Sequence, residues 1–176
     1  MGSTPTVQTY NFTIVEPLVV TVANANFDPI SGWHNGSVSI SATAGLPITY
    51  TLDGAGPFSL ANGASFTVTD PGTTVVEVFA GTADVYREVR VDTDGAPTVT
   101  PVTPVPGQVI PFGSPSSPFA WTCADDSPFG CSALLDGVPV SLGAALPTAP
   151  GSYLLEITGT DILGQTATVP VAFTVD

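Results

Sequence analysis

Short stretches of alternating apolar and polar residues dominate this sequence, and they constrain its fold more than any other feature. In residues 38–42, valine, isoleucine and alanine occupy every second position, with serines between them. Such alternation turns one side of a β-strand toward a core and the other side toward water. Gly, Pro, Asn and Asp interrupt the stretches at short intervals, and helical periodicity is hard to find. The sequence therefore predicts an all-β fold.

The alternating stretches fall into two groups along the chain. The first group comprises residues 18–23, 38–43, 48–52, 64–69, 75–80 and 85–92. The second group comprises residues 98–102, 119–124, 132–135, 153–161 and 166–175. Asp53-Gly54 and Asp70-Pro71-Gly72 supply the backbone conformations that tight reversals require. We expect residues 153–161 and 166–175 to form a hairpin, because residues 161–165 contain a reversing Asp and Gly.

The junction between the two groups is very short. Residues 91–100 end one alternating stretch, turn through Asp94-Gly95 and Pro97, and begin the next. This pattern predicts two tandem β-sandwiches, with the first module at 17–94 and the second at 95–176. Proline restricts its own φ and the conformation of the preceding residue. We therefore expect a restricted hinge and a rod-like pair of modules.

The first sixteen residues do not fit either module. Residues 1–3 resemble a cloning remnant, and residues 11–15 echo the end of the chain at 172–176. Residues 10–15 are therefore interpreted either as the last strand of a preceding module or as the first strand of this one. An unpaired closing strand would favour strand exchange with a second molecule. Without such exchange, the sequence predicts a monomer.

The charge of the chain excludes several classes of partner. The sequence has two Lys or Arg residues against fifteen Asp or Glu, with a formal net charge of −13. A chain this acidic would repel the phosphates of nucleic acids and of anionic membranes. No apolar run reaches the roughly 18 residues that a membrane-spanning helix needs. We therefore expect neither nucleic-acid binding nor direct membrane insertion.

The two cysteines suggest a disulfide and an oxidising compartment. Cys123 and Cys131 lie eight positions apart, with no nearby histidine or further cysteine to complete a zinc site. Disulfides persist mainly outside the cytosol, so we expect an extracellular or cell-surface protein. Phe119, Trp121 and Cys123 occupy alternate positions, which predicts that the indole lies beside the disulfide in the core.

Several motifs resemble a known group of proteins. Gly32-Trp33-His34-Asn35, Tyr50-Thr51-Leu52-Asp53-Gly54 and Val91-Asp92-Thr93 look like the Ig-like repeats of large bacterial surface and secreted proteins. Trp121-Thr122-Cys123-Ala124-Asp125-Asp126 and residues 158–166 are similar to HYR-type bacterial Ig-like modules. The first module departs from this pattern at residues 81–84, where the usual Asp-x-x-Gly-Asn turn is replaced.

The resemblance implies a non-catalytic spacer, stalk or adhesion module within a longer polypeptide. Its partners would be neighbouring modules of the same polypeptide, and a protein or glycan of a cell surface is a further candidate. The alternative is a carbohydrate-binding accessory module of a polysaccharide-active enzyme. For that role Trp33 is the candidate glycan contact, although a tryptophan at a strand entry more often closes the end of a sandwich.

Catalytic residues are scarce in this sequence. The chain contains one histidine, His34, and no recognisable Ser, His and Asp arrangement. His34 precedes an expected strand, so we interpret it as a turn or rim residue. The short strands also indicate no cleft that would hold the paired carboxylates of a glycosidase. We therefore expect that the protein is not an enzyme.

Calcium is the one metal that the sequence raises. Asp92 and Asp94, together with Asp161 and Glu16, fall where module boundaries are predicted. Calcium takes about six to eight oxygen ligands, often carboxylates. Residues 92–95, however, lack the rest of an EF-hand loop, and Asp beside Gly commonly forms an Asx-type turn. We expect no metal or other cofactor, with calcium at Asp92 and Asp94 as the alternative.

Overall fold

The computed structural model describes residues 15–114 and 117–176. All the elements of regular secondary structure in these ranges are β-strands. Among these residues, no helix has the length and apolar character that membrane crossing requires. The strand predicted at residues 10–15 lies outside the described residues except for Val15, which is exposed. The predicted strand exchange through this segment therefore stays a prediction.

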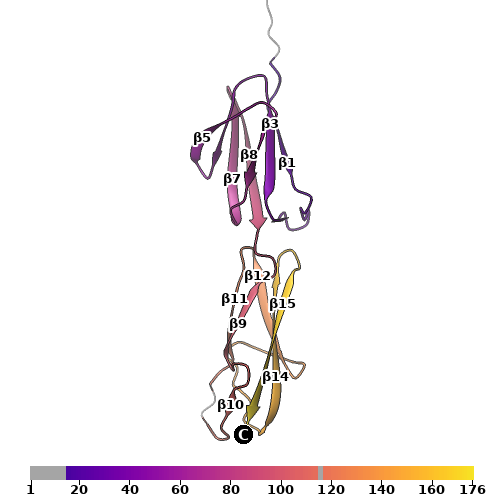
Figure 1. The fold of residues 1–176 in the computed structure, drawn as a ribbon, viewed down its shortest axis with the longest axis vertical. Helices are drawn as coiled ribbons and strands as arrows, with labels where there is room; N and C mark the ends of the chain where they lie inside the picture. The colour runs from indigo at the N-terminus through magenta and orange to yellow at the C-terminus, as the bar shows by residue number, and fades with distance from the viewer. Residues whose placement is uncertain (1–14, 115–116) are drawn as a thin grey trace, which may run out of the picture. The chain divides into compact units, whose positions relative to one another are not determined.

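The strands of the first half form two sheets (Figure 1). They are β1 (Val19–Ala23), β2 (His34–Asn35), β3 (Val38–Thr43), β4 (Ile48–Leu52), β5 (Ala55–Leu60), β6 (Ser65–Val68), β7 (Gly72–Ala80) and β8 (Ala83–Asp92). One sheet has the order β1-β3-β6, and the other has the order β2-β8-β7-β4-β5. Val38, Ile40 and Ala42 are buried, which confirms the inward face predicted for residues 38–42.

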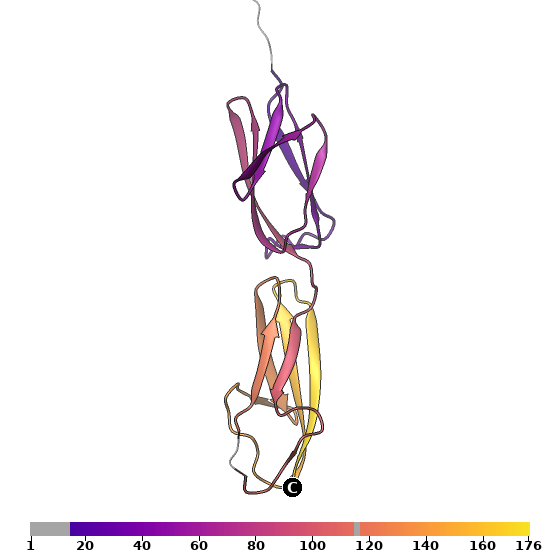
Figure 2. The ribbon, with the colours of Figure 1, turned by 60° about the vertical axis from the view of Figure 1, so that its left-hand side comes forward.

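The strands of the second half also form two sheets. They are β9 (Thr98–Thr103), β10 (Val109–Ile110), β11 (Ala120–Ala124), β12 (Phe129–Leu135), β13 (Val138–Val140), β14 (Gly151–Asp161) and β15 (Thr166–Val175). One sheet pairs β11 with β9, and the other has the order β10-β15-β14-β12-β13. β9 lies beside β14 and β15, which makes two layers (Figure 2).

The core of the second half lies between these layers. Its buried residues are Phe119, Trp121, Ala133, Leu146, Leu155, Ile157, Val171, Phe173 and Val175, with Cys123 packed against them. Trp121 is buried as predicted, but the disulfide lies at the margin of the core, because Cys123 is only partly buried and Cys131 is exposed. The Tyr153 hydroxyl donates a hydrogen bond to the Ala149 carbonyl at 2.8 Å. A tyrosine bonded to backbone a few residues upstream at the start of a strand is typical of Ig-like sandwiches.

The predicted strands are all present, but the structure adds four that the sequence pattern missed. β14 and β15 form the predicted hairpin, with Thr160 opposite Thr166. β2 and β10 contain only two residues each, so they carry no readable periodicity. β5 is exposed over nearly its whole length and contains Pro57, so it lacks the apolar alternation of a core strand. β13 contains only three residues, one of which is Pro139.

A matching Asp-Gly turn occurs in both halves. Asp53 and Asp136 both adopt a positive φ, at 49° and 47°, and each is followed by a glycine with a φ of 80°. In each turn the aspartate main-chain N–H donates a hydrogen bond to a residue of the adjacent strand in the sheet, and the aspartate Oδ1 accepts a hydrogen bond from the same residue. Asp53 pairs in this way with Val75, and Asp136 pairs with Leu154, at 2.7 to 2.9 Å. The two halves therefore repeat one local design.

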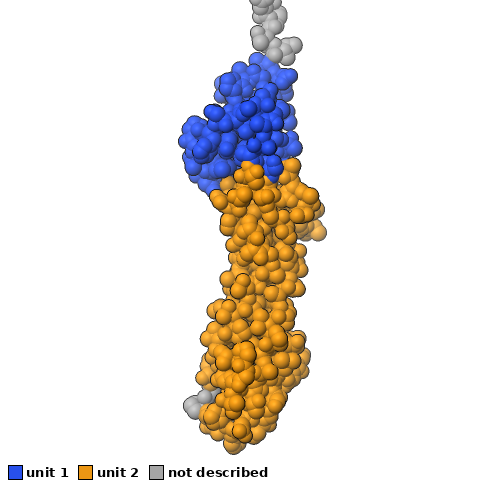
Figure 3. Space-filling model, in the orientation of Figure 1, with its two compact units in different colours: residues 1–22, 39–66, 75–87 blue, residues 23–38, 67–74, 88–176 orange. Residues whose placement is uncertain are grey.

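The chain divides into two compact units, and their boundaries along the sequence differ from the boundary between the two groups of sheets. Among the described residues, the first unit contains 15–22, 39–66 and 75–87, and the second contains 23–38, 67–74, 88–114 and 117–176 (Figure 3). The sheets instead separate between Asp92, where β8 ends, and Thr98, where β9 begins. The predicted module boundary at residues 94–95 lies in this interval and stays a prediction.

We expect the Asp136 turn to depend on its side-chain oxygen. Asp136→Ala removes the acceptor for the Leu154 N–H and places alanine at a positive φ, so the free energy of unfolding should fall by about 1–2 kcal/mol. Asp136→Asn keeps an acceptor and a residue that tolerates this conformation, so its loss should be less than half as large. Urea denaturation measures both values. Equal losses in the two variants would show that the oxygen contributes nothing.

Candidate metal centre

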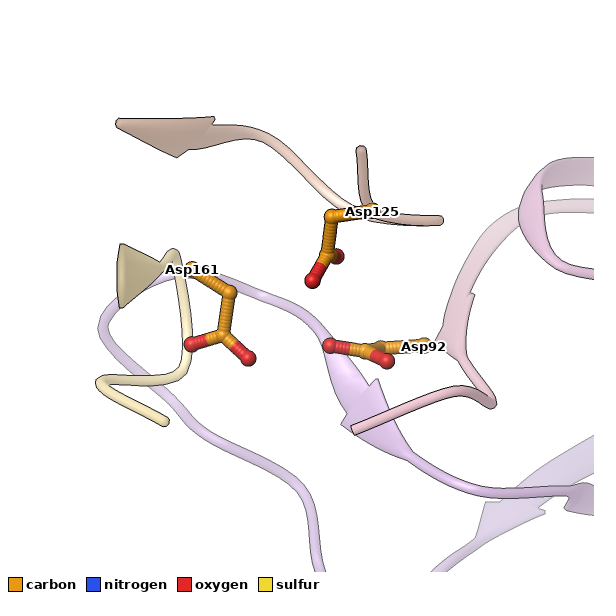
Figure 4. Close-up of side chains that lie close together, drawn as sticks. All are labelled: Asp92, Asp125 and Asp161. Carbon is orange, nitrogen blue, oxygen red and sulfur yellow. The ribbon is translucent and has the colours of Figure 1, made fainter. Parts of the chain in front are cut away.

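Three aspartates from distant parts of the sequence meet in the second compact unit. Asp92 is the last residue of β8, Asp125 follows β11 directly, and Asp161 is the last residue of β14. One carboxylate oxygen from each of them lies within 4.8 Å of the others. Figure 4 shows the three carboxylates directed toward a common point. We call Asp92, Asp125 and Asp161 the acidic cluster.

Strand pairing explains why two of these residues approach each other. Phe129, at the start of β12, lies opposite Asp161 at the end of β14. The loop that leads into β12 therefore runs beside the end of β14, and this loop carries Asp125. The Cys123–Cys131 disulfide joins β11 to β12 and closes the same loop. The predicted disulfide is present, and it limits the positions that Asp125 can take.

Each carboxylate of the acidic cluster uses one oxygen to hold local backbone. All three of these oxygens are Oδ1 atoms that accept hydrogen bonds from residues two to four positions further along the chain. The donors are the Gly95 N–H to Asp92 at 3.3 Å, the Ser127 N–H and Oγ to Asp125 at 2.7 Å each, and the Gln165 N–H to Asp161 at 2.7 Å. These bonds fix the orientation of each carboxylate.

The second oxygens of the three carboxylates have no hydrogen-bond partner. The Oδ2 atoms of Asp92, Asp125 and Asp161 are buried and unpaired. Asp92 is 0% exposed and Asp161 is 7% exposed. Burying a charged group without a partner is costly, and like charges close together add to that cost. Burial raises the pKa of the Asp92 carboxyl, and the charges of Asp125 and Asp161 raise it further.

The basic side chains of the protein are engaged elsewhere. Arg90 forms a salt bridge with Glu88 at 3.1 Å, and Arg87 donates a hydrogen bond to the Tyr86 carbonyl at 2.8 Å. The chain has no other Lys or Arg. A set of carboxylate oxygens with no basic partner has the chemistry of a site for a hard divalent cation.

The calcium candidates from the sequence have different positions in the structure. Asp92 and Asp161 belong to the acidic cluster, whereas Asp94 and Glu16 do not. Asp94 Oδ1 instead accepts a hydrogen bond from the Asp126 N–H at 3.4 Å. Asp125 was missed by the sequence analysis. Its position directly after a predicted strand, as for Asp92 and Asp161 at strand ends, is the signal that could have found it.

Trp33 and His34 are both buried. Trp33 is 8% exposed, so its ring offers little surface for stacking on a sugar. His34 is 7% exposed and lies in β2, where it pairs with Val91. The interpretation of His34 as a turn or rim residue is therefore wrong, because this short strand adds it to the edge of a sheet. Its Nδ1 has no hydrogen-bond partner, and its ring contacts Phe27 at a centroid distance of 4.7 Å.

Comparisons with known proteins show a likeness of fold. No protein-family profile matches the sequence, and no curated protein matches it. The four N-terminal Ig domains of Dscam1 isoform 7.44 match 89% of this chain with a TM-score of 0.52 and 13% identity, and the match covers 46% of that structure.

Two further solved structures are also similar. Ig domains 1–4 of Sidekick-1 match 92% of this chain and 49% of their own, with a TM-score of 0.49 and 13% identity. Fibronectin(III)-like modules of Clostridium thermocellum CbhA match 90% of this chain and 94% of their own, with a TM-score of 0.39 and 14% identity. The sheets of the structure and the likeness to the Dscam1 Ig domains show an all-β, Ig-like fold, and identities this low carry no information about function.

The buried position of His34 predicts a pH dependence of stability. Burial lowers the pKa of His34, so between pH 6.5 and its lower folded pKa the unfolded chain binds a proton that the folded chain does not. The stabilisation is complete above about pH 6.5 and is lost as the pH falls through the folded pKa. The difference in melting temperature between the parent and His34→Asn should therefore narrow from pH 7 to pH 5. A constant difference would contradict this assignment.

Proposed function

We propose that this chain is a non-catalytic, extracellular spacer or adhesion module of a larger bacterial surface or secreted protein. The Ig-like fold supports a modular, non-enzymatic role. The disulfide between Cys123 and Cys131 supports an oxidising compartment. The resemblance of residues 32–35 and 121–126 to bacterial Ig-like repeats supports the bacterial surface context.

The observation that carries the spacer role is the anchoring of the connector between β8 and β9. Within the second compact unit, Thr93 Oγ1 donates a hydrogen bond to Asp126 Oδ2 at 2.6 Å. Pro97 is fully buried, and a Cβ added to Gly159 would lie 2.9 Å from the Pro97 Cβ. These contacts hold residues 93–97 against β14 and its neighbouring loop. A connector held in this way transmits force and direction better than a free linker does.

A carbohydrate-binding accessory module is the second candidate, and the structure favours it less. Sugar recognition by stacking needs an exposed aromatic face beside polar groups. Trp33 is buried, so its ring closes the interior of the fold instead of lining a surface. The resemblance of residues 32–35 and 121–126 to bacterial Ig-like repeats, which is also compatible with an accessory module, is the remaining support for this alternative.

Small-angle X-ray scattering tests the spacer role. We expect the parent chain to give a single narrow ensemble. A variant with a six-residue Gly-Ser insertion between Gly95 and Ala96 should give a broader distribution of distances, since such a linker behaves as a flexible coil. A second variant with the same insertion at the exposed turn between Gly81 and Thr82 is the matched control, and its distribution should stay narrow. Identical broad ensembles for all three proteins would contradict the proposal.

A glycan array separates the spacer from the carbohydrate-binding alternative. We expect the parent chain to bind no glycan above background, because Trp33 offers little exposed ring surface. Saturable binding of a defined oligosaccharide, confirmed by calorimetry, would favour the accessory-module alternative. The same array probed with the Gly-Ser insertion variant controls for nonspecific capture.

A further inference from the structure

We propose that Asp92, Asp125 and Asp161 form a calcium-binding site. The inference goes beyond the spacer role and does not depend on it. The three residues come from the end of β8, the loop after β11 and the end of β14, and all belong to the second compact unit. The observations that carry it are the spacing of the carboxylates, the unpaired Oδ2 atoms and the burial of the residues that hold them.

The spacing of the oxygens fits a single calcium ion. Two oxygens that each bind one ion at about 2.4 Å lie no more than about 4.8 Å apart. The acidic cluster meets this condition, since one oxygen of each carboxylate lies within 4.8 Å of the other two. The carboxylates also face one another in Figure 4. Three distant chain segments thus place their charged groups around one point.

The unpaired oxygens are an independent observation that points to a ligand. The Oδ2 atoms of all three residues are buried and lack a hydrogen-bond partner. Asp92 is 0% exposed and Asp161 is 7% exposed, so water reaches these side chains poorly. A carboxylate in such a position normally has a basic partner or a metal. Arg87 and Arg90 bind Tyr86 and Glu88 instead, so a bound cation is the counter-charge that the arrangement lacks.

The Oδ1 bonds prepare the site before any ion binds. Each Oδ1 atom holds a turn through a main-chain N–H, from Gly95, Ser127 or Gln165. The disulfide closes the loop of Asp125. The carboxylates are therefore oriented by the fold, and the free oxygens are left for coordination. Water that reaches the ion beside Asp125, which is only partly buried, completes the coordination sphere, as is usual for calcium.

The chemistry of the ligands selects the class of ion. All three side chains offer oxygen, and neither His34 nor a cysteine belongs to the acidic cluster. Zinc and copper favour nitrogen and sulfur ligands, whereas calcium and magnesium favour oxygen. Magnesium requires near-ideal octahedral geometry and keeps most of its waters, so it should bind this partly buried set more weakly than calcium does.

Calorimetry and thermal unfolding of the full chain test the site. After dialysis against EDTA and then metal-free buffer, we expect one calcium ion per chain to bind with a Kd of about 10⁻⁴ to 10⁻³ M, the range of extracellular modules. At a calcium concentration about ten times the Kd, the melting temperature of the second unit should rise by about 5 °C. Magnesium at the same concentration should produce a smaller rise.

Substitutions within the acidic cluster provide the decisive readout. Asp125→Asn keeps an Oδ1 acceptor for the Ser127 N–H but removes one of three like charges. In EDTA it should therefore unfold at the same temperature as the parent or higher, yet its rise with calcium should be lost or its Kd should increase at least tenfold. Asp161→Asn tests the same point if Asp125→Asn does not fold.

Asp84→Asn is the matched control. Asp84 is exposed and lies near the start of β8, roughly 26 Å along the strand from Asp92. The variant carries the same change of charge, so its response to calcium should equal that of the parent.

Two results would overturn the site. One is a rise with calcium in Asp125→Asn and Asp161→Asn equal to that of the parent. The other is a parent chain that binds no calcium at 10 mM, in which case a proton shared between the carboxylates reduces their negative charge instead.

Discussion

The antiparallel pairing of β12 with β14 is the constraint on which the second half of the structure depends. It sets Ala133 opposite Ile157 and Leu135 opposite Leu155, so the inward side chains of both strands meet in the core. The same register sets Phe129 opposite Asp161. A slip of one residue would turn Leu155 and Ile157 toward water and move the loop of Asp125 away from Asp161. One register therefore fixes both the core and the approach of Asp125 to Asp161.

The acidic cluster contributes unfavourably to the stability of the fold, unlike other aspartates of this chain. Elsewhere the aspartates stabilise the structure, as at Asp53 and Asp136, where each side chain accepts a hydrogen bond from the next strand. In the acidic cluster three carboxylates each have an unpaired, buried oxygen. Proteins usually keep such local conflicts only where another function requires them. The buried Oδ2 atoms without hydrogen-bond partners are the reason to assign a ligand to the cluster.

The sequence predicted most of the fold because its strands have clear periodicity. Residues 38–43 and 166–175 were predicted with the bounds of β3 and β15, since apolar and polar residues alternate along them. β5 was missed because it is exposed, and the alternating pattern reports burial more than strand pairing. His34 was misplaced for a related reason: a two-residue strand joins it to the edge of a sheet through a partner distant in sequence.

The sequence by itself determined the all-β class, the two groups of strands, the turns at Asp53-Gly54 and the pairing of Cys123 with Cys131. These features depend on local periodicity, on glycine at positive φ and on the proximity of the only two cysteines. Only the tertiary structure decided that Asp92, Asp125 and Asp161 meet and that Trp33 is buried. The ends of three strands come together through long-range pairing and packing of the sheets, and no local pattern records which strand ends become neighbours.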